Sequence, residues 1–169
     1  VYSNIGNFEE ALVNYRKALR IELNALGCYH PNVAISFNNI GSVYYYEGNF
    51  KEALINYKKA LDIQKRIYGN MHPDVAISHN NIGDVHYEIK GFKEALINYQ
   101  KGLDIQMKIF GLYHNDVANT FRRIGLLHAT QGDNRNALSN LKKSLMIKMK
   151  VLDKDNQEIS RLQNLIQQY

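Results

Sequence analysis

The chain has 169 residues, of which 45% are hydrophobic and 22% are charged, a composition typical of folded globular proteins and not of disordered ones. No apolar run approaches the roughly 20 residues needed to cross a bilayer, so the sequence excludes a membrane span. The formal net charge is +5, and between Arg122 and Lys154 eight basic residues face two acidic ones. This local excess favours an acidic partner surface, although a solvated helix face explains it equally well.

The sequence repeats itself with a period of 42 residues. Between 30–69 and 72–111, 27 of 40 aligned positions are identical. The same step separates four sets of equivalent residues: His30, His72 and His114; Gly41, Gly83 and Gly125; Ala11, Ala53, Ala95 and Ala137; and Leu12, Leu54, Leu96 and Leu138. A fixed period of this length is typical of stacked repeats, in which no unit can bury its apolar face alone. Such proteins usually present a surface to partners, so binding is the first functional hypothesis.

In chain order, the apolar spacing predicts a helix over 8–26 and then helix pairs over about 31–69, 73–111 and 115–152. The second helix of each pair follows a residue type favoured at an N-cap, at Asn7, Asn49, Gly91 and Asp133. Glu10, Glu52 and Glu94 lie three residues further on, as in a capping box. The fourth copy has Asn136 there, so we expect a weaker cap. A last helix over 157–168 repeats the phase of the first helices.

These elements predict a single domain over 1–169. It consists of a partial repeat over 1–27, full repeats over 28–69, 70–111 and 112–153, and a final helix over 156–168, and residues 1–5 are expected to be the remnant of a first helix. The final helix is expected either to cap the array or to begin another repeat. Since the chain starts inside a repeat and without methionine, we expect it to be a fragment of a longer protein.

Small residues recur where the two helices of a unit should meet. Gly41, Gly83 and Gly125 are expected to let the helices approach closely, and Ala53, Ala95 and Ala137 to do so from the opposite helix. Tyr57 and Tyr99 are expected to fill the gap between repeats. We interpret all of these positions as packing.

The repeat motif resembles a known family. Asn38-Asn39-Ile40-Gly41-Ser42-Val43-Tyr44, then Gly48-Asn49-Phe50-Lys51-Glu52-Ala53-Leu54 and Tyr57-Lys58-Lys59-Ala60-Leu61, is similar to a tetratricopeptide repeat. The 42-residue period, the His-Pro-(Asn/Asp)-Val-Ala turn and the Asn-Asn pair resemble the kinesin light chain subclass. The resemblance covers about residues 5–155. It implies an all-α fold, a right-handed solenoid of helical hairpins.

The resemblance also implies a peptide-binding groove on a concave face lined by the first helices. In kinesin light chains this groove takes short cargo peptides with aromatic and acidic residues. The residues expected to line it here are Asn38, Asn39, Ser42, Tyr45, Asn80, Asn81, Asp84, Tyr87, Asn119, Arg122 and Arg123. Asparagine amides both donate and accept, so they suit a peptide backbone. The alternative is that the Asn-Asn pairs only form polar contacts between neighbouring first helices.

Two adjacent arginines, Arg122 and Arg123, replace the third Asn-Asn pair and could form charge-assisted hydrogen bonds to a carboxylate. The tyrosines could accept an apolar anchor. A co-chaperone clamp for a terminal carboxylate is disfavoured, because only Asn81 and Arg123 match its pattern and both lysines are absent.

Other functions are disfavoured. No catalytic constellation, phosphate loop or metal-ligand spacing stands out, so we expect neither an enzyme nor a cofactor. Nucleic-acid binding is disfavoured because the basic residues spread over both helices of the last unit. The single cysteine, Cys28, excludes an intrachain disulfide and favours a reducing, cytoplasmic setting. We expect a protein or peptide partner, and the alternative is a structural spacer that associates end to end with its own copies.

Overall fold

The computed structural model describes residues 8–153 and 156–169. Over these residues the chain forms eight helices and no strand. The helices are α1 (Phe8–Leu26), α2 (Pro31–Tyr46), α3 (Phe50–Tyr68), α4 (Pro73–Glu88), α5 (Phe92–Phe110), α6 (Asn115–Thr130), α7 (Asn134–Val151) and α8 (Gln157–Ile166). The predicted all-α helical-repeat solenoid is confirmed. The final helix ends two residues earlier than expected, and the predicted remnant over 1–5 lies outside the described residues.

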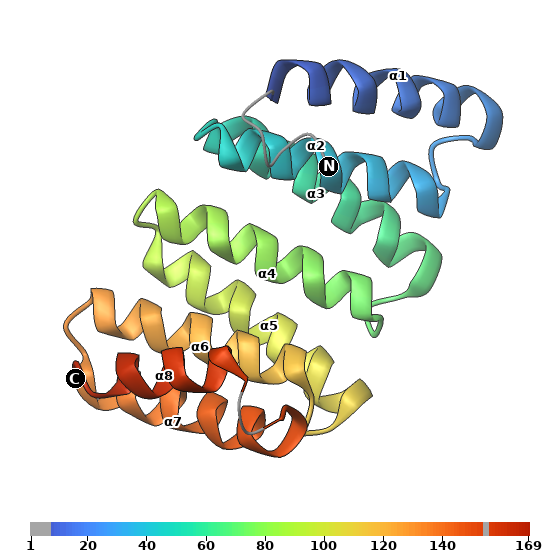
Figure 1. The fold of residues 1–169 in the computed structure, drawn as a ribbon. Coiled ribbons are helices and arrows are strands. Elements are labelled where there is room, and N and C mark those ends of the chain that lie inside the picture. Colours follow the sequence, from blue (N-terminus) through green and yellow to red (C-terminus); the bar gives the residue numbers. More distant parts are fainter. Residues whose placement is uncertain (1–7, 154–155) are drawn as a thin grey trace.

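The helices stack in chain order as antiparallel pairs (Figure 1). The hairpins α2–α3, α4–α5 and α6–α7 follow one another, with α1 at one end and α8 against the last hairpin at the other. The principal contacts join helices that are adjacent in sequence, as in a quasi-one-dimensional repeat protein. No helix in the described ranges is both long and apolar enough to cross a membrane.

The three repeated histidines are the N-caps of the first helices, a role that the sequence analysis missed. The Nδ1 atoms of His30, His72 and His114 each accept a hydrogen bond from the backbone N–H two residues further on, at 3.2 Å. The rings of His72 and His114 also stack on the last aromatic residue of the preceding helix, Tyr68 and Phe110. Each of these two histidines therefore joins one repeat to the next.

The second helices begin as predicted, but their caps differ in quality. Asn49 accepts from the N–H of Glu52 at 3.4 Å, whereas Gly91 offers no side-chain cap. Asp133 accepts from both the backbone N–H (3.1 Å) and the side-chain amide (2.7 Å) of Asn136. The expectation of a weaker fourth cap is therefore wrong, because the amide of Asn136 reaches the second carboxylate oxygen. The remaining predicted cap, Asn7, lies outside the described residues.

The glycine positions mark the closest approach inside each hairpin. A Cβ atom added to Gly83 would lie 2.5 Å from Cε1 of Tyr99, and one on Gly41 would lie 2.8 Å from the ring of Tyr57. At Gly125 the nearest atom is Cγ of Leu141, also at 2.8 Å. The tyrosines therefore pack first against their own hairpin, and not only between repeats as the sequence suggested. Ala53, Ala95 and Ala137 are fully buried opposite them.

Candidate functional site

The first helices and α8 together border three adjoining hollows. One of about 210 Å³ is lined by Tyr45, Asp84, Tyr87, Glu88, Tyr99, Arg122, Arg123 and Leu126. A second, of about 180 Å³, is lined by Ile77, Asn80, Asn81, Gln106, Asp116, Asn119 and Arg123. The third, of about 240 Å³, is lined by Asn119, Arg122, Lys148, Glu158, Arg161, Leu162 and Leu165. Each pair of hollows shares one wall residue, so we treat the three as one first-helix groove.

The first asparagine of each predicted pair is engaged between helices. Asn80 is only 3% exposed, and its Nδ2 donates to Oγ1 of Thr120 on α6 at 2.9 Å. The side chain of Asn80 can be buried this deeply because residue 102 is glycine: a Cβ atom at that position would lie 2.5 Å from Oδ1 of Asn80. In the preceding repeat, Oδ1 of Asn38 lies 3.4 Å from Oγ of Ser78 on α4. For Asn80 the structure therefore shows the alternative role, a polar contact between neighbouring first helices.

The second asparagine of each pair is accessible. Asn39 and Asn81 are half-buried, and neither amide has a hydrogen-bond partner within the described part of the chain. The same holds for Asn119, one helix further along. Asn81 and Asn119 line the same hollow beside the exposed side chain of Ile77. These amides are free to donate and accept at a ligand.

Hydroxyl groups along the groove form hydrogen bonds both within a hairpin and between neighbouring first helices. Ser42 accepts from Oη of Tyr57 at 3.1 Å, within its own hairpin. Oη of Tyr45 donates to Glu88 at 3.2 Å, and the hydroxyls of Tyr87 and Thr130 lie 2.7 Å apart. Burial, and then the nearby carboxylates, raise the pKa of Tyr45, so its phenol stays protonated. The rings of Tyr45 and Tyr87 therefore form walls of the groove, and each hydroxyl is held by a side chain of the next first helix.

The two arginines predicted to act together are separated by their partners. Nε of Arg123 donates to both carboxylate oxygens of Asp84, at 3.0 and 3.3 Å. Asp84 also accepts from Oη of Tyr99 at 2.8 Å, and burial followed by this carboxylate raises the pKa of that phenol. The charge of Arg123 is thus already compensated. Arg122 is exposed and has no ion-pair partner among the residues described.

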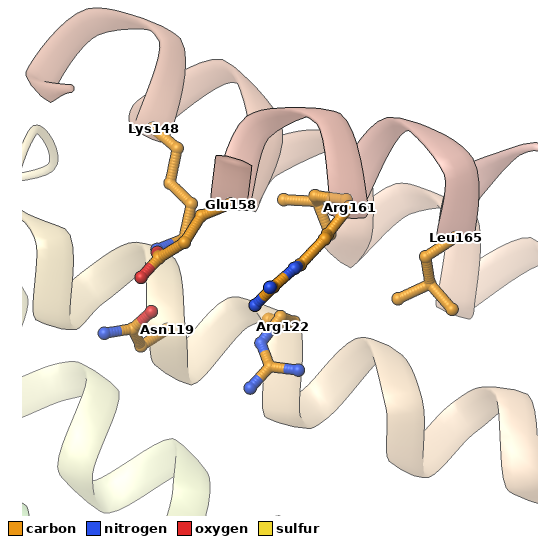
Figure 2. A pocket seen from close by; sticks show the side chains of 7 residues that line it. Asn119, Arg122, Lys148, Glu158, Arg161 and Leu165 are labelled. Carbon is orange, nitrogen blue, oxygen red and sulfur yellow. The ribbon is translucent and has the colours of Figure 1, made fainter. Parts of the chain in front are cut away.

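Five of the residues that line the third hollow were not predicted from the sequence, and three of these five are charged. Lys148 is 2% exposed, forms an ion pair with Glu158 of α8 and donates to Oδ1 of Asn115 at 3.0 Å. The ion pair lowers the pKa of Glu158. Arg161, also on α8, projects toward Arg122 of α6 (Figure 2).

The 42-residue step itself held a signal for Lys148. The side-chain pairs Glu22–Ser36, Gln64–Ser78 and Gln106–Thr120 join successive repeats at 2.6, 2.7 and 2.8 Å. Lys148 lies one period after Gln106, at the position of the first member of each pair. The second member would be Leu162, one period after Thr120, and leucine cannot accept a hydrogen bond. The lysine bonds to Glu158 instead. Within the residues described, no group of three His, Cys, Asp or Glu side chains is arranged to hold a metal ion.

Comparisons with known proteins agree on the fold. The match to BtubC (BKLC) from P. vanneervenii covers 95% of this chain and 64% of that one, with a TM-score of 0.85 and 21% identity. A putative kinesin light chain with nearly identical TPR-like repeats from Podosopora anserina matches with a TM-score of 0.77 and 18% identity, over 99% of this chain and 89% of that one. For the N-terminal domain of stress-induced protein-1 from C. elegans the TM-score is 0.59 and the identity 21%, over 80% and 95% of the two chains.

At these identities the structural likeness establishes the fold, and on that level the resemblance to kinesin light chain repeats is confirmed. No curated protein sequence is significantly similar to the chain. The sequence model of the tetratricopeptide repeat, however, matches residues 1–66, 38–108 and 74–150, which together span most of the chain. The chain therefore belongs to the tetratricopeptide repeat family.

Proposed function

We propose that this chain is a non-catalytic interaction module that holds an extended segment of a partner protein in the first-helix groove, in a cytoplasmic setting. Tetratricopeptide repeats are in general protein–protein interaction modules. The observation that carries the proposal is the pair of unpartnered amides, Asn81 and Asn119, on one hollow of this groove. An extended peptide exposes backbone N–H and C=O groups, and an asparagine amide can bond to both regardless of the peptide's sequence.

The surrounding side chains support a peptide with apolar and acidic residues. Ile77 is exposed next to the two amides and offers an apolar contact. Tyr45 and Tyr87 provide ring faces in the adjoining hollow. Arg122 lines both that hollow and the next and makes no ion pair among the residues described, so it favours a ligand carboxylate.

The test is selection from a random peptide library displayed against the wild type and against an Asn81→Ala/Asn119→Ala variant. The control carries Asn14→Ala and Asn24→Ala, the same chemical change at two exposed positions of α1. We expect selected peptides to bind the wild type and the control equally and the groove variant about tenfold more weakly, as two lost hydrogen bonds imply. Failure to select any peptide, or equal binding to all three proteins, would contradict the proposal.

One observation favours the second candidate function, a spacer that packs end to end. Ile21 of α1 is 66% exposed, whereas its counterparts one, two and three periods later, Ile63, Ile105 and Ile147, are all buried. In the later repeats this isoleucine packs against the first helix of its own hairpin, and no such helix precedes α1 within the described residues. In this chain, Ile21 is therefore open to contact with a second copy. The groove lies on other helices, so the two functions do not exclude each other.

A further inference from the structure

We propose that α6 and α8 form a carboxylate receptor at the end of the groove, with Arg122 and Arg161 gripping a carboxyl group of the bound peptide from opposite sides. This inference rests on the proposed function and specifies the ligand chemistry at one end of the same groove. It assigns α8 a part in recognition, in addition to covering the last hairpin. The receptor is the hollow of about 240 Å³ between these helices.

The two guanidinium groups converge on this hollow. Figure 2 shows the Arg161 side chain reaching from α8 toward Arg122 on α6. Neither Arg122 nor Arg161 makes an ion pair in the described ranges, and the hydrogen bond that Arg161 donates to Oε1 of Gln157, at 3.3 Å, is exposed. Both guanidinium groups also attract the carboxylate of Glu158, which is paired with Lys148. Guanidinium groups bind carboxylates through two parallel N–H···O bonds, so both side chains have donors to spare.

The charges in the wall of the hollow do not balance. Lys148, Arg122 and Arg161 line it, and Glu158 is the only carboxylate among the lining residues. That carboxylate is already paired with the buried ammonium of Lys148. Arg122 and Arg161 also attract this carboxylate, after Lys148. The lining still carries an excess of two positive charges, and an incoming carboxylate reduces the repulsion among them.

The repeat register confines this pair to one end of the chain. One and two periods earlier, the position of Arg122 is held by Asn80 and Asn38. The position of Arg161 is held by Asn119 and then by Ile77. Earlier first helices therefore carry neutral side chains at both positions, and the charge is specific to the junction of α6 with α8. Asn119 lines this hollow and the preceding one, which connects the receptor to the peptide-binding amides.

A peptide can supply the carboxylate from an acidic side chain or from its C-terminus, and three synthetic probes distinguish these sources. Acetyl-Ala-Glu-Ala-amide carries only the side-chain carboxylate, acetyl-Ala-Ala-Ala carries only the terminal one, and acetyl-Ala-Ala-Ala-amide carries neither. Each is titrated over the millimolar range at low ionic strength, where screening is weakest. The readout is the NMR shift of the arginine Nε–H signals, which report directly on guanidinium hydrogen bonds.

We expect saturable shifts of Arg122 and Arg161 with one or both carboxylate probes and none with the amide. Arg161→Gln and Arg122→Gln, which alter opposite walls, are each expected to weaken binding about tenfold. Arg20→Gln makes the same charge change on α1 and should leave the affinity unchanged. The inference is overturned if no carboxylate probe binds, if the amide binds equally well, or if both pocket variants keep wild-type affinity.

The two experiments fail independently. Peptide selection that depends on Asn81 and Asn119, together with absent carboxylate binding, would overturn the receptor and leave the proposed function standing. Carboxylate binding at the two arginines without any selected peptide would contradict the proposed function alone.

Discussion

Histidine is an uncommon N-cap, and here it starts three successive helices through Nδ1, which must be unprotonated to accept the backbone hydrogen bond. Replacing His72 by alanine should remove both this bond and the stacking on Tyr68, lowering the free energy of unfolding by about 1–2 kcal/mol. His72→Asn should recover part of the loss, because asparagine is a favoured N-cap. Urea unfolding measures both variants, and equal losses would show that capping is not the cause.

A second histidine makes stability depend on pH. Burial lowers the pKa of His79 from 6.5, more than its bond to Asn98 raises it. The unfolded chain therefore binds a proton more readily, and stability should fall as the pH drops below about 6.5. His79→Phe, which copies Phe37 of the preceding repeat, should make this fall shallower without abolishing it, because burial also lowers the pKa of His86. Thermal unfolding between about pH 7 and about pH 5 tests the difference; an unchanged slope would contradict the assignment.

At this scale the repeated Asn-Asn pairs were visible in the sequence, but their separate roles were not. The two members of a pair differ by about 100° around the helix, so one can face a neighbouring helix while the other faces solvent. How deeply the first member sinks depends on Gly102, whose counterparts are Ala60 and Ser144. That contact joins different helices, and no local pattern reveals it.

Whole helices, by contrast, were predicted closely. The bounds of α1 agree with the expectation, because the apolar period and the terminating glycine give the same answer in the first three copies. The helix α8 was also expected, but its contribution to a pocket was not. That contribution depends on Lys148, which is one of the eight basic residues between Arg122 and Lys154 and is also one of the most buried side chains.

The close packing inside a hairpin yields an element-scale prediction. Gly83→Ala places a methyl group 2.5 Å from the buried ring of Tyr99, whose hydroxyl is held by Asp84. The strain should exceed the roughly 1 kcal/mol that alanine gains over glycine in a helix, giving a net loss of about 1–2 kcal/mol. Chemical denaturation measures this, and an unchanged or raised midpoint would contradict the packing.

An opposite effect is expected at the start of α5. Gly91 holds the N-cap position without a side-chain bond, and a Cβ there would approach no atom closer than 3.4 Å. Gly91→Asn copies Asn49 of the preceding repeat and should raise stability by about 0.3–0.5 kcal/mol. A loss of stability on the same denaturation curve would show that the cap geometry is not transferable between repeats.

Across the whole molecule, the pairing of charges was beyond sequence reasoning. Arg123 and Asp84 lie almost one period apart, so they meet only because the hairpins stack. Stacking thereby places Asp84 against Arg123 and compensates the charge of that arginine. Arg122 instead lines a hollow together with Arg161 of the last helix. A repeat period predicts which helices are neighbours, but not which polar side chains find each other between them.

The exposed side chain of Ile21 on α1 gives a prediction about the association of this chain with itself. Ile21 occupies a position that is core in the three later repeats, so burying it against a second copy removes apolar surface from water. Sedimentation velocity over a concentration series should show reversible association of the wild type. Ile21→Glu should abolish it, because a carboxylate in such an interface would be desolvated without a partner. Ile35→Glu makes the same change at a similarly exposed position of α2, on another face, and should associate like the wild type. A wild type that stays monomeric throughout, or equal behaviour of the two variants, would contradict packing through α1 and leave the groove as the molecule's interaction surface.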